Sequence, residues 1–231
     1  MKRFICTTGL LAVGAASVAR ADPVILQPDE PQSKDVFVYQ FLSNMNFDTG
    51  GFGALLASGR TSSGHDLRSF LQFDLTGVTL NAGEIATLNL RVGSTAAAGF
   101  GVNPSPAAPV VANVHRGTGA WDESAVTWGT QPPFDAAAAA SRTISGIDQW
   151  VSFDVTPLVQ SWLSNPGTNF GLAVTQQDVV SNNGPVVAVY ESSAGANKPY
   201  LQIAPVPEPG AAGLAFTGAS AMLLRRKRAT R

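Results

Sequence analysis

Short runs of alternating apolar and polar residues recur along most of the chain and are separated by Gly, Pro, Ser and Asn. Because successive side chains of a strand point to opposite sides of a sheet, this pattern predicts β-strands with one buried face and one wet face. Helical periodicity is nearly absent in the same region. The predicted strands cover residues 35–42, 67–75, 84–92, 109–116, 149–155, 170–176, 186–191 and 200–204.

Residues 84–92 illustrate the alternation. Leu88 and Leu90 are predicted to face the core, whereas Asn89 and Arg91 are predicted on the wet face. Residues 121–128 predict a turn that leads into a further short strand, and the Ala-rich stretch after it is interpreted as a loop or an irregular strand. The total is roughly nine or ten strands.

One helix is predicted directly after the strand 149–155. Thr156 is expected to be its N-cap and Pro157 its first residue, and an apolar face that includes Trp162 follows. Asn165-Pro166-Gly167 should end it. Many short strands with one covering helix predict an all-β fold, a two-sheet β-sandwich of jelly-roll type.

The N-terminal residues 1–21 have the pattern of a signal peptide. Lys2 and Arg3 precede an apolar run, and Ala19-Arg20-Ala21 offers a small-x-small cleavage site. We therefore expect an exported protein whose mature chain begins at Asp22. The predicted sandwich domain covers residues 22–204, and no second domain fits in the remaining length.

The C-terminal residues 205–231 have the pattern of a membrane anchor. Pro207, Glu208 and Pro209 form a turn that neither strand nor helix can continue. An uncharged run, 210–224, follows and would reach roughly 22 Å as a helix, less than the roughly 30 Å of a hydrocarbon core. The cluster that ends it should stay in the cytoplasm and consists of Arg225, Arg226, Lys227 and Arg228.

Charge and cysteine content narrow the function. From residue 22 to residue 206 the chain has seven Lys or Arg against fifteen Asp or Glu, a balance of −8, so nucleic acid and anionic lipid are not expected partners of the domain. The one cysteine, Cys6, lies in the predicted signal peptide, which excludes thiol catalysis in the mature chain. His65 and His115 lack the spacing of a zinc site.

Aromatic side chains are the better candidates for function, because sugar binding uses flat rings that stack on C–H faces. Trp128 and Trp162 fit core positions, whereas Trp121 and Trp150 are predicted to be exposed and are tentative ligand-binding residues. A cationic strip beside them is possible if the strands that carry the basic residues are neighbours. The basic residues of this strip are also tentative ligand-binding residues and are Arg68, Arg91, Arg116 and Lys198.

No catalytic residues are predicted. Asp66, Asp122, Glu123 and Asp154 supply carboxyl groups, but without the spacing that a polysaccharide lyase or glycosidase would display. Asp154 and Asp74 are interpreted as structural residues that cap turns at strand ends.

No cofactor is predicted, apart from a weak possibility of calcium. Asp35, Asn46 and Asp48 place oxygen ligands near a Gly-rich turn, although no D-x-D-x-D-G loop occurs.

Several runs resemble, in order, those of the DNRLRE domain family of secreted β-sandwich modules. Residues 68–75 (RSFLQFDL) are similar to its R-x-[FY]-L-x-F-D-L strand, 121–128 to its W-x-E-x-x-V-T-W segment and 153–162 to its F-D-V-T-x-x-V-x-x-W element. Residues 169–172 and 191–201 are similar to its closing strands. The resemblance implies an extracellular sandwich, with carbohydrate binding in some relatives and no implied catalysis.

The tail 206–228 resembles the PEP-CTERM sorting signal of Gram-negative bacteria that produce exopolysaccharide, on its Pro-Glu-Pro, apolar and basic parts. The resemblance implies recognition by an exosortase, transient anchoring in the inner membrane, and delivery to the cell surface or extracellular matrix.

Three hypotheses about function follow. The first is a non-catalytic surface protein that binds extracellular polysaccharide. The second is a structural coat protein without a specific ligand. The third, a polysaccharide lyase or glycosidase, ranks last because no catalytic constellation is visible.

Overall fold

The computed structural model describes residues 22–28, 33–48, 55–95, 99–193 and 196–206. The predicted signal peptide and, apart from Pro205 and Val206, the predicted sorting segment lie outside these residues. Within the described part of the chain no helix is both long and apolar enough to cross a bilayer.

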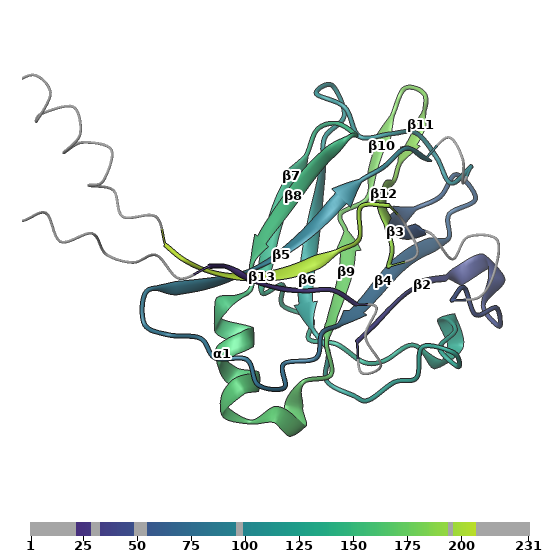
Figure 1. The fold of residues 1–231 in the computed structure, drawn as a ribbon. Helices are drawn as coiled ribbons and strands as arrows, with labels where there is room; N and C mark the ends of the chain where they lie inside the picture. The colour runs from purple at the N-terminus through teal and green to yellow at the C-terminus, as the bar shows by residue number, and fades with distance from the viewer. Residues whose placement is uncertain (1–21, 29–32, 49–54, 96–98, 194–195, 207–231) are drawn as a thin grey trace, which may run out of the picture.

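Antiparallel strands make up most of the described chain (Figure 1). The strands are β1 (Val24–Leu26), β2 (Lys34–Tyr39), β3 (Leu55–Arg60), β4 (Asp66–Gln72), β5 (Glu84–Val92), β6 (Val110–Arg116), β7 (Ala140–Ile144), β8 (Gln149–Asp154), β9 (Leu172–Gln176), β10 (Val179–Ser181), β11 (Gly184–Val186), β12 (Ala188–Glu191) and β13 (Tyr200–Pro205). The helices are α1 (Thr156–Ser164) and the 3-10 turns η1 (Gln40–Leu42), η3 (Trp128–Thr130) and η4 (Pro166–Thr168).

Two sheets form the sandwich. In the first sheet β5 is central, with β8 on one edge and β13 followed by β1 on the other. The second sheet has the order β2-β4-β9-β6-β7. β3 joins them, because it pairs with β12 of the first sheet through residues 55–58 and with β4 through residues 59–60. The predicted all-β sandwich is therefore confirmed.

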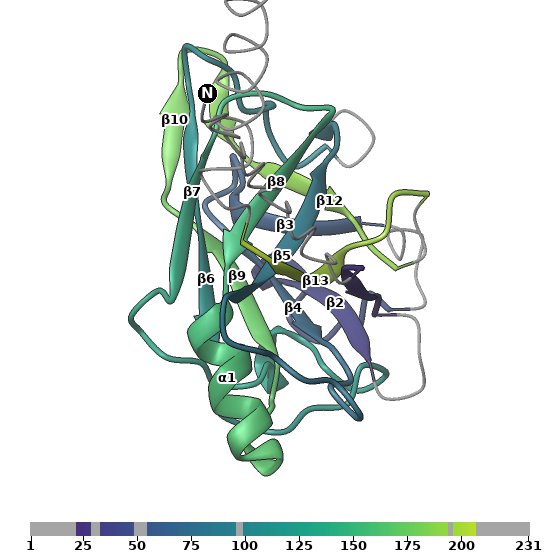
Figure 2. The same ribbon diagram turned by 60° about the vertical axis from the view of Figure 1, so that its left-hand side comes forward.

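The core lies between the sheets and is built by the alternation that the sequence displays. Leu88 and Leu90 of β5 are fully buried, as are Phe153 of β8 and Leu71 of β4. Each such side chain contributes about 1.5–3 kcal/mol by leaving water. The helix α1 covers one end of the sandwich and buries Trp162 against it (Figure 2).

The start of the helix differs from the prediction. Val155, rather than Thr156, is the N-cap residue, so Pro157 is the second residue of the helix instead of the first. The Thr156 hydroxyl is used elsewhere, because its Oγ1 accepts a hydrogen bond from the backbone N–H of Ala86 at 2.9 Å. That bond fastens the helix to β5.

Several predicted strand boundaries are wrong. The first predicted strand, 35–42, ends at Tyr39 because the chain turns into η1. Residues 121–128 form a turn and the start of η3, with no strand. The Ala-rich stretch is a loop over residues 136–139, in agreement with one of its two interpretations, and the strand β7, which was not predicted, begins at its last alanine, Ala140. The prediction also missed β1, β3 and β10, whose short or Gly-containing sequences show little alternation.

Candidate functional site

The outer face of the first sheet carries an exposed tryptophan. Along β8, Val151 and Phe153 point into the core, so Trp150 points outward and is 42% exposed. Trp150 is the register partner of Arg91 on β5. On the other edge of β5, Tyr200 of β13 pairs with Asn89 and shares the outer face. The three-strand register thus brings two aromatic rings and an arginine to one surface.

The two rings touch. Trp150 and Tyr200 meet edge to face, with centroids 5.1 Å apart and an interplanar angle of 64°. They line a shallow depression of about 380 Å³ together with Lys198 and Gln202. We call the surface formed by Trp150, Tyr200, Arg91 and Lys198 the Trp150 platform. Apolar rings edged by polar groups are the usual composition of a ligand-binding surface.

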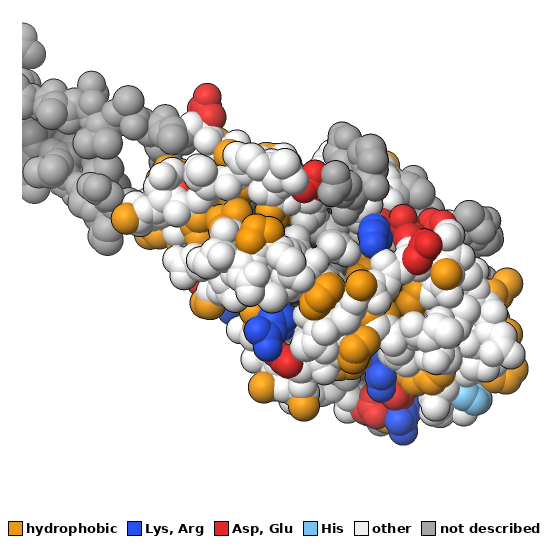
Figure 3. Space-filling view, turned by 90° about the horizontal axis from the view of Figure 1, so that it is seen from below, with side chains coloured by type: hydrophobic (Ala, Val, Ile, Leu, Met, Phe, Trp, Pro, Cys, Tyr) orange, Lys and Arg blue, Asp and Glu red, His pale blue; other side chains and the backbone are white. Residues whose placement is uncertain are grey.

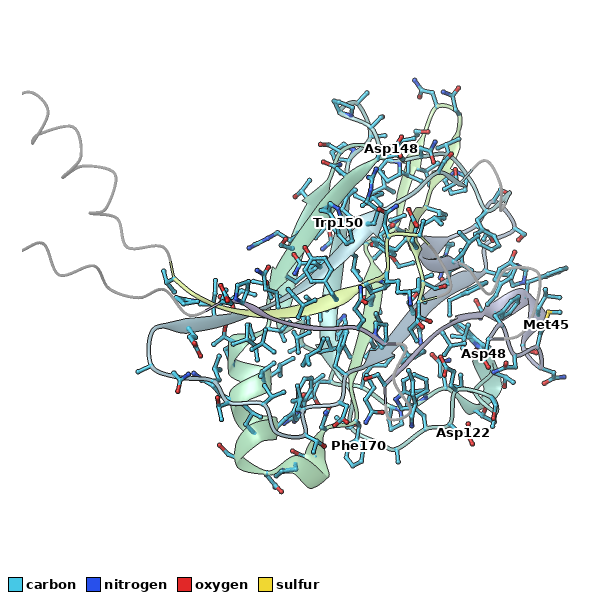
Figure 4. All side chains as sticks on the ribbon, in the orientation of Figure 1. Met45, Asp48, Asp122, Asp148, Trp150 and Phe170 are labelled. Carbon is cyan, nitrogen blue, oxygen red and sulfur yellow. The ribbon has the colours of Figure 1, made fainter. Side chains whose placement is uncertain are left out.

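Polar contacts orient the platform from its rim. The Arg91 guanidinium lies 3.4 Å from the carboxylate of Asp148, which takes a left-handed conformation with φ of 59°. Figure 4 shows Asp148 beside Trp150 at the start of β8, far from Asp48 and Asp122. Asn89, predicted to face water, is instead buried on this face, where it accepts a hydrogen bond from the Ser152 hydroxyl. The arginine is therefore held beside the rings.

Trp121 is half-buried, so the prediction that it is exposed is wrong. Its indole Nε1 donates a hydrogen bond to the backbone carbonyl of Phe170 at 3.1 Å. The Lys34 ammonium lies 5.2 Å from the ring centroid and donates to the carbonyl of Trp121 itself at 2.6 Å. Because its indole N–H is hydrogen-bonded and a cation lies against its ring, Trp121 is held in place by contacts within the protein.

Trp128 has a similar arrangement with Arg68. The Arg68 guanidinium lies 4.6 Å from the centroid of Trp128 and 5.6 Å from that of Phe134. Trp121 and Phe134 also pack on Phe70 of β4, which is buried although it points out of the sandwich. We call Trp121, Trp128 and Phe134 the tryptophan cover. It explains an apolar residue on the predicted wet face of β4.

The basic residues do not form one cationic strip. Arg68 and Arg116 belong to the second sheet, whereas Arg91 and Lys198 lie on the platform of the first. Arg116 is paired with Asp135 at 2.9 Å. On the face drawn in Figure 3, Lys and Arg side chains lie beside Asp and Glu side chains rather than in a continuous basic patch.

Glu123, beside the tryptophan cover, has an unusual environment. Burial is the main reason that the pKa of its carboxyl is raised to about 7. A hydrogen bond from the Asp35 backbone N–H lowers this pKa, whereas the charges of Asp48 and Asp35 raise it further. The sequence gives no sign of this, because the groups lie more than seventy positions apart in the chain.

Three other carboxylates have structural roles. Asp74, Asp122 and Asp154 each accept hydrogen bonds from a hydroxyl and a backbone N–H two residues later, and those bonds lower the pKa of each carboxyl. The expected turn-capping role of Asp74 and Asp154 is confirmed.

The calcium candidates Asp35, Asn46 and Asp48 lie around Glu123. The Asn46 amide is used as a donor to the carbonyls of Glu123 and Val126, both at 2.7 Å. Among the residues that the structure describes, no three His, Cys, Asp or Glu side chains are grouped to hold a metal ion. The described chain thus gives the calcium hypothesis no support beyond two nearby carboxylates.

A cavity of about 490 Å³ lies between the helical segment 162–169 and the turn after β4. Trp162 is in its wall and is 3% exposed, as expected for a core residue. Its indole N–H is buried without a hydrogen-bond partner among the described residues. Because this N–H is closed off from solvent, it offers nothing to a ligand in the cavity.

Comparisons with known proteins bear on the whole sandwich. The family model of carbohydrate-binding module family 96 matches residues 29–205, which include the Trp150 platform and the tryptophan cover.

Curated relatives match over a shorter region. The chain is 33% identical over 102 residues to the tRNA nuclease WapA of Bacillus subtilis strain 168, which is 38% of this chain and 4% of that protein. The tRNA3(Ser)-specific nuclease WapA of Bacillus spizizenii is 32% identical over the same length, again 4% of that protein. The chain therefore matches a small part of much longer proteins.

Proposed function

The chain belongs to carbohydrate-binding module family 96, and we propose that it is a non-catalytic module that binds polysaccharide through the Trp150 platform. The observation that carries this proposal is the exposed Trp150 ring in contact with Tyr200 on a flat sheet face. Sugar rings present C–H groups that stack on such aromatic surfaces, and the platform's polar groups can bind the hydroxyl groups at the ring edge.

Trp150 differs from Trp121 and Trp128 in the contacts that its indole ring makes within the protein. The indole of Trp121 is bonded to a backbone carbonyl and that of Trp128 is covered by Arg68, whereas Trp150 has a 5.1 Å ring contact on an otherwise exposed surface. A long polysaccharide crossing a shallow platform suits this geometry better than a small enclosed ligand.

Affinity electrophoresis tests the proposal. The purified chain is run through gels that contain neutral or acidic polysaccharides, with Trp150→Ala and the matched control Phe41→Ala, an exposed aromatic away from the platform. We expect at least one polysaccharide to retard the wild type and the control equally, and to retard Trp150→Ala clearly less. Equal retardation of all three would place binding elsewhere, and no retardation by any polysaccharide would refute the function.

We also propose that the chain is exported, sorted by an exosortase and displayed at the cell surface or in the extracellular matrix. The support is the residue pattern of 1–21 and 205–231. The arrangement of the described ends agrees with it, because β1 and β13 pair antiparallel and bring Asp22 and Val206 to the same end of the first sheet (Figure 1).

The Trp150 side of the platform lies away from that end, whereas the depression beside it extends to Ile25 of β1. Pro205 pairs with Glu84 at the start of β5, whereas Trp150 pairs with Arg91, seven residues further along. At about 3.3 Å per residue the separation is roughly 23 Å. A domain held at its terminal end would therefore present the platform to the surroundings.

Mass spectrometry tests export and sorting. Protein recovered from an exosortase-containing bacterium should begin at Asp22 and lack the basic cluster Arg225–Arg228. A chain that keeps residues 1–21 would contradict export, and a retained basic cluster would contradict sorting by cleavage.

A further inference from the structure

A second cavity, of about 360 Å³, lies on the outer face of the second sheet. Strands β4, β9 and β6 are neighbours there, and their outward residues include Arg68, Thr175 and His115. Asp178 and Phe134 complete the wall from the segments beside the sheet. The cavity therefore faces away from the Trp150 platform, because the two lie on opposite layers of the sandwich.

The charged groups in the wall of this cavity form ion pairs, one of them with an arginine beside the wall. That arginine, Arg60, contacts Asp66 through its Nε at 2.8 Å and Asp178 at 3.3 Å, and Arg68 Nη2 lies 3.5 Å from the second oxygen of Asp66. The Arg68 guanidinium also lies over the Phe134 ring, 5.6 Å from its centroid. Each guanidinium carries five N–H donors and each carboxylate several acceptor positions, so these ion pairs leave hydrogen-bonding capacity on both.

The neutral groups are also pre-oriented. His115 is 7% exposed and its ring nitrogens contact the carbonyl of Asp135 and the hydroxyl of Thr175, each at 2.9 Å. Gln176 is fixed by hydrogen bonds to the backbone of Val186 and Ala188. A ligand would therefore meet a wall whose side chains need little further ordering, which lowers the entropic cost of binding.

The charges indicate which ligand fits. The wall residues Asp66, Asp178 and Arg68, together with Arg60 beside the wall, have formal charges that sum to zero. An anion would therefore lie near two carboxylates and a cation near two guanidinium groups. Paired donors and acceptors in fixed geometry suit a ligand with adjacent hydroxyl groups, which donate and accept at once. Phe134 adds an apolar surface for C–H groups. The volume is at the small end of ligand cavities, roughly 300–1,000 Å³.

We propose that this cavity is a second glycan-binding site, which takes a short neutral sugar segment and makes the protein bivalent. The proposal rests on the proposed function, since it adds a site to a polysaccharide-binding module. Two sites on opposite faces bind two different glycan chains, so the protein links chains instead of only attaching to one.

The experiment removes each site separately. The double variant Arg60→Ala/Asp178→Ala deletes two exposed polar groups of the second site and leaves the net charge unchanged. It is combined with Trp150→Ala, and Glu84→Ala is the control for loss of a half-buried carboxylate outside both sites. Thermal unfolding checks that every variant is folded. The probes are cellohexaose, mannohexaose, xylohexaose and laminarihexaose in isothermal titration with the full chain.

We expect Trp150→Ala to keep binding at least one hexaose with one equivalent per chain, and the triple variant to bind it at least tenfold more weakly. Beads coated with the matching neutral polysaccharide should aggregate with wild type and not with the double variant. Three outcomes overturn the second site: no hexaose binds the wild type, Trp150→Ala removes all binding, or the triple variant binds like Trp150→Ala. The proposed function is judged independently, by gel retardation of wild type and Trp150→Ala.

Discussion

The Trp150 platform and the tryptophan cover contain the same residue types but differ in the exposure of their tryptophan rings. Each places tryptophan beside a basic residue on the outside of a sheet. In the cover, Lys34 and Arg68 lie against the rings of Trp121 and Trp128, and a backbone carbonyl takes the indole N–H of Trp121. In the platform, Arg91 is held by Asp148 beside Trp150 and the ring stays 42% exposed. A tryptophan next to a cation is therefore not a binding site until its exposed surface is known.

The difference predicts which change damages the fold and which damages binding. Trp121→Ala should destabilise the protein by about 3 kcal/mol, because it uncovers Phe70 and leaves the Phe170 carbonyl without its donor. Phe41→Ala, at a ring that is 61% exposed, should change stability by less than about 0.5 kcal/mol. Chemical denaturation measures both. A Trp121→Ala variant as stable as Phe41→Ala would end the distinction between cover and platform.

Trp150→Ala should show the opposite profile. We expect glycan affinity to fall roughly thirtyfold, about 2 kcal/mol, from the loss of stacking, with a stability change within about 1 kcal/mol. Titration with the polysaccharide that retards the wild type measures the affinity. The claim fails if stability drops as far as in Trp121→Ala while the remaining folded protein binds normally.

Glu123 gives a pH test of the cover. Its pKa rises from the ordinary 4.5 to about 7 on folding, so the folded state binds an extra proton between those values. The stabilisation of the folded state by this proton is complete below pH 4.5 and is lost as the pH rises through about 7. Glu123→Gln keeps the acceptor for the Asp35 N–H, so at pH 8 it should stabilise by about 1–2 kcal/mol after allowance for solvent screening.

At pH 4 the same variant should match the wild type. Unfolding free energies across pH 4–8 measure the effect, with Glu84→Gln as the control at a half-buried carboxyl away from the tryptophan cover. Parallel pH profiles for wild type and Glu123→Gln would show that the buried carboxyl does not titrate as argued.

The smallest effect concerns the stacked arginine of the cover. Arg68→Lys keeps the charge but loses the planar group over Trp128 and Phe134, so we expect a cost of about 1 kcal/mol in stability. Arg142→Lys, at a position outside both surfaces, is the control. Equal denaturation midpoints for the two variants would show that the stacking contributes nothing.

The sequence is informative where alternation is strong. Residues 84–92 and 149–155 were predicted almost as observed, because their apolar residues alternate and are large. The strand β7 was missed because the alanines around it carry no alternation. The burial of Trp121 was missed for a different reason, since its partners Lys34 and Phe170 are 87 and 49 residues away.

The candidate site was predictable only in part. Trp150 and Arg91 could be placed on the wet faces of their strands, but the sequence does not say that β8 and β13 flank the same strand. Only that topology brings Tyr200 to Trp150 and separates Arg68 from Arg91. The sequence identifies the residue types, whereas the order of the strands determines which side chains come into contact.

The most direct test follows the indole N–H signals of the tryptophans by NMR while the binding glycan is added to the full chain. We predict that the signal of Trp150 shifts with a saturating dependence on glycan concentration, and that those of the half-buried Trp121 and the buried Trp162 stay in place. A saturating shift at Trp121 with no change at Trp150 would contradict recognition by the platform.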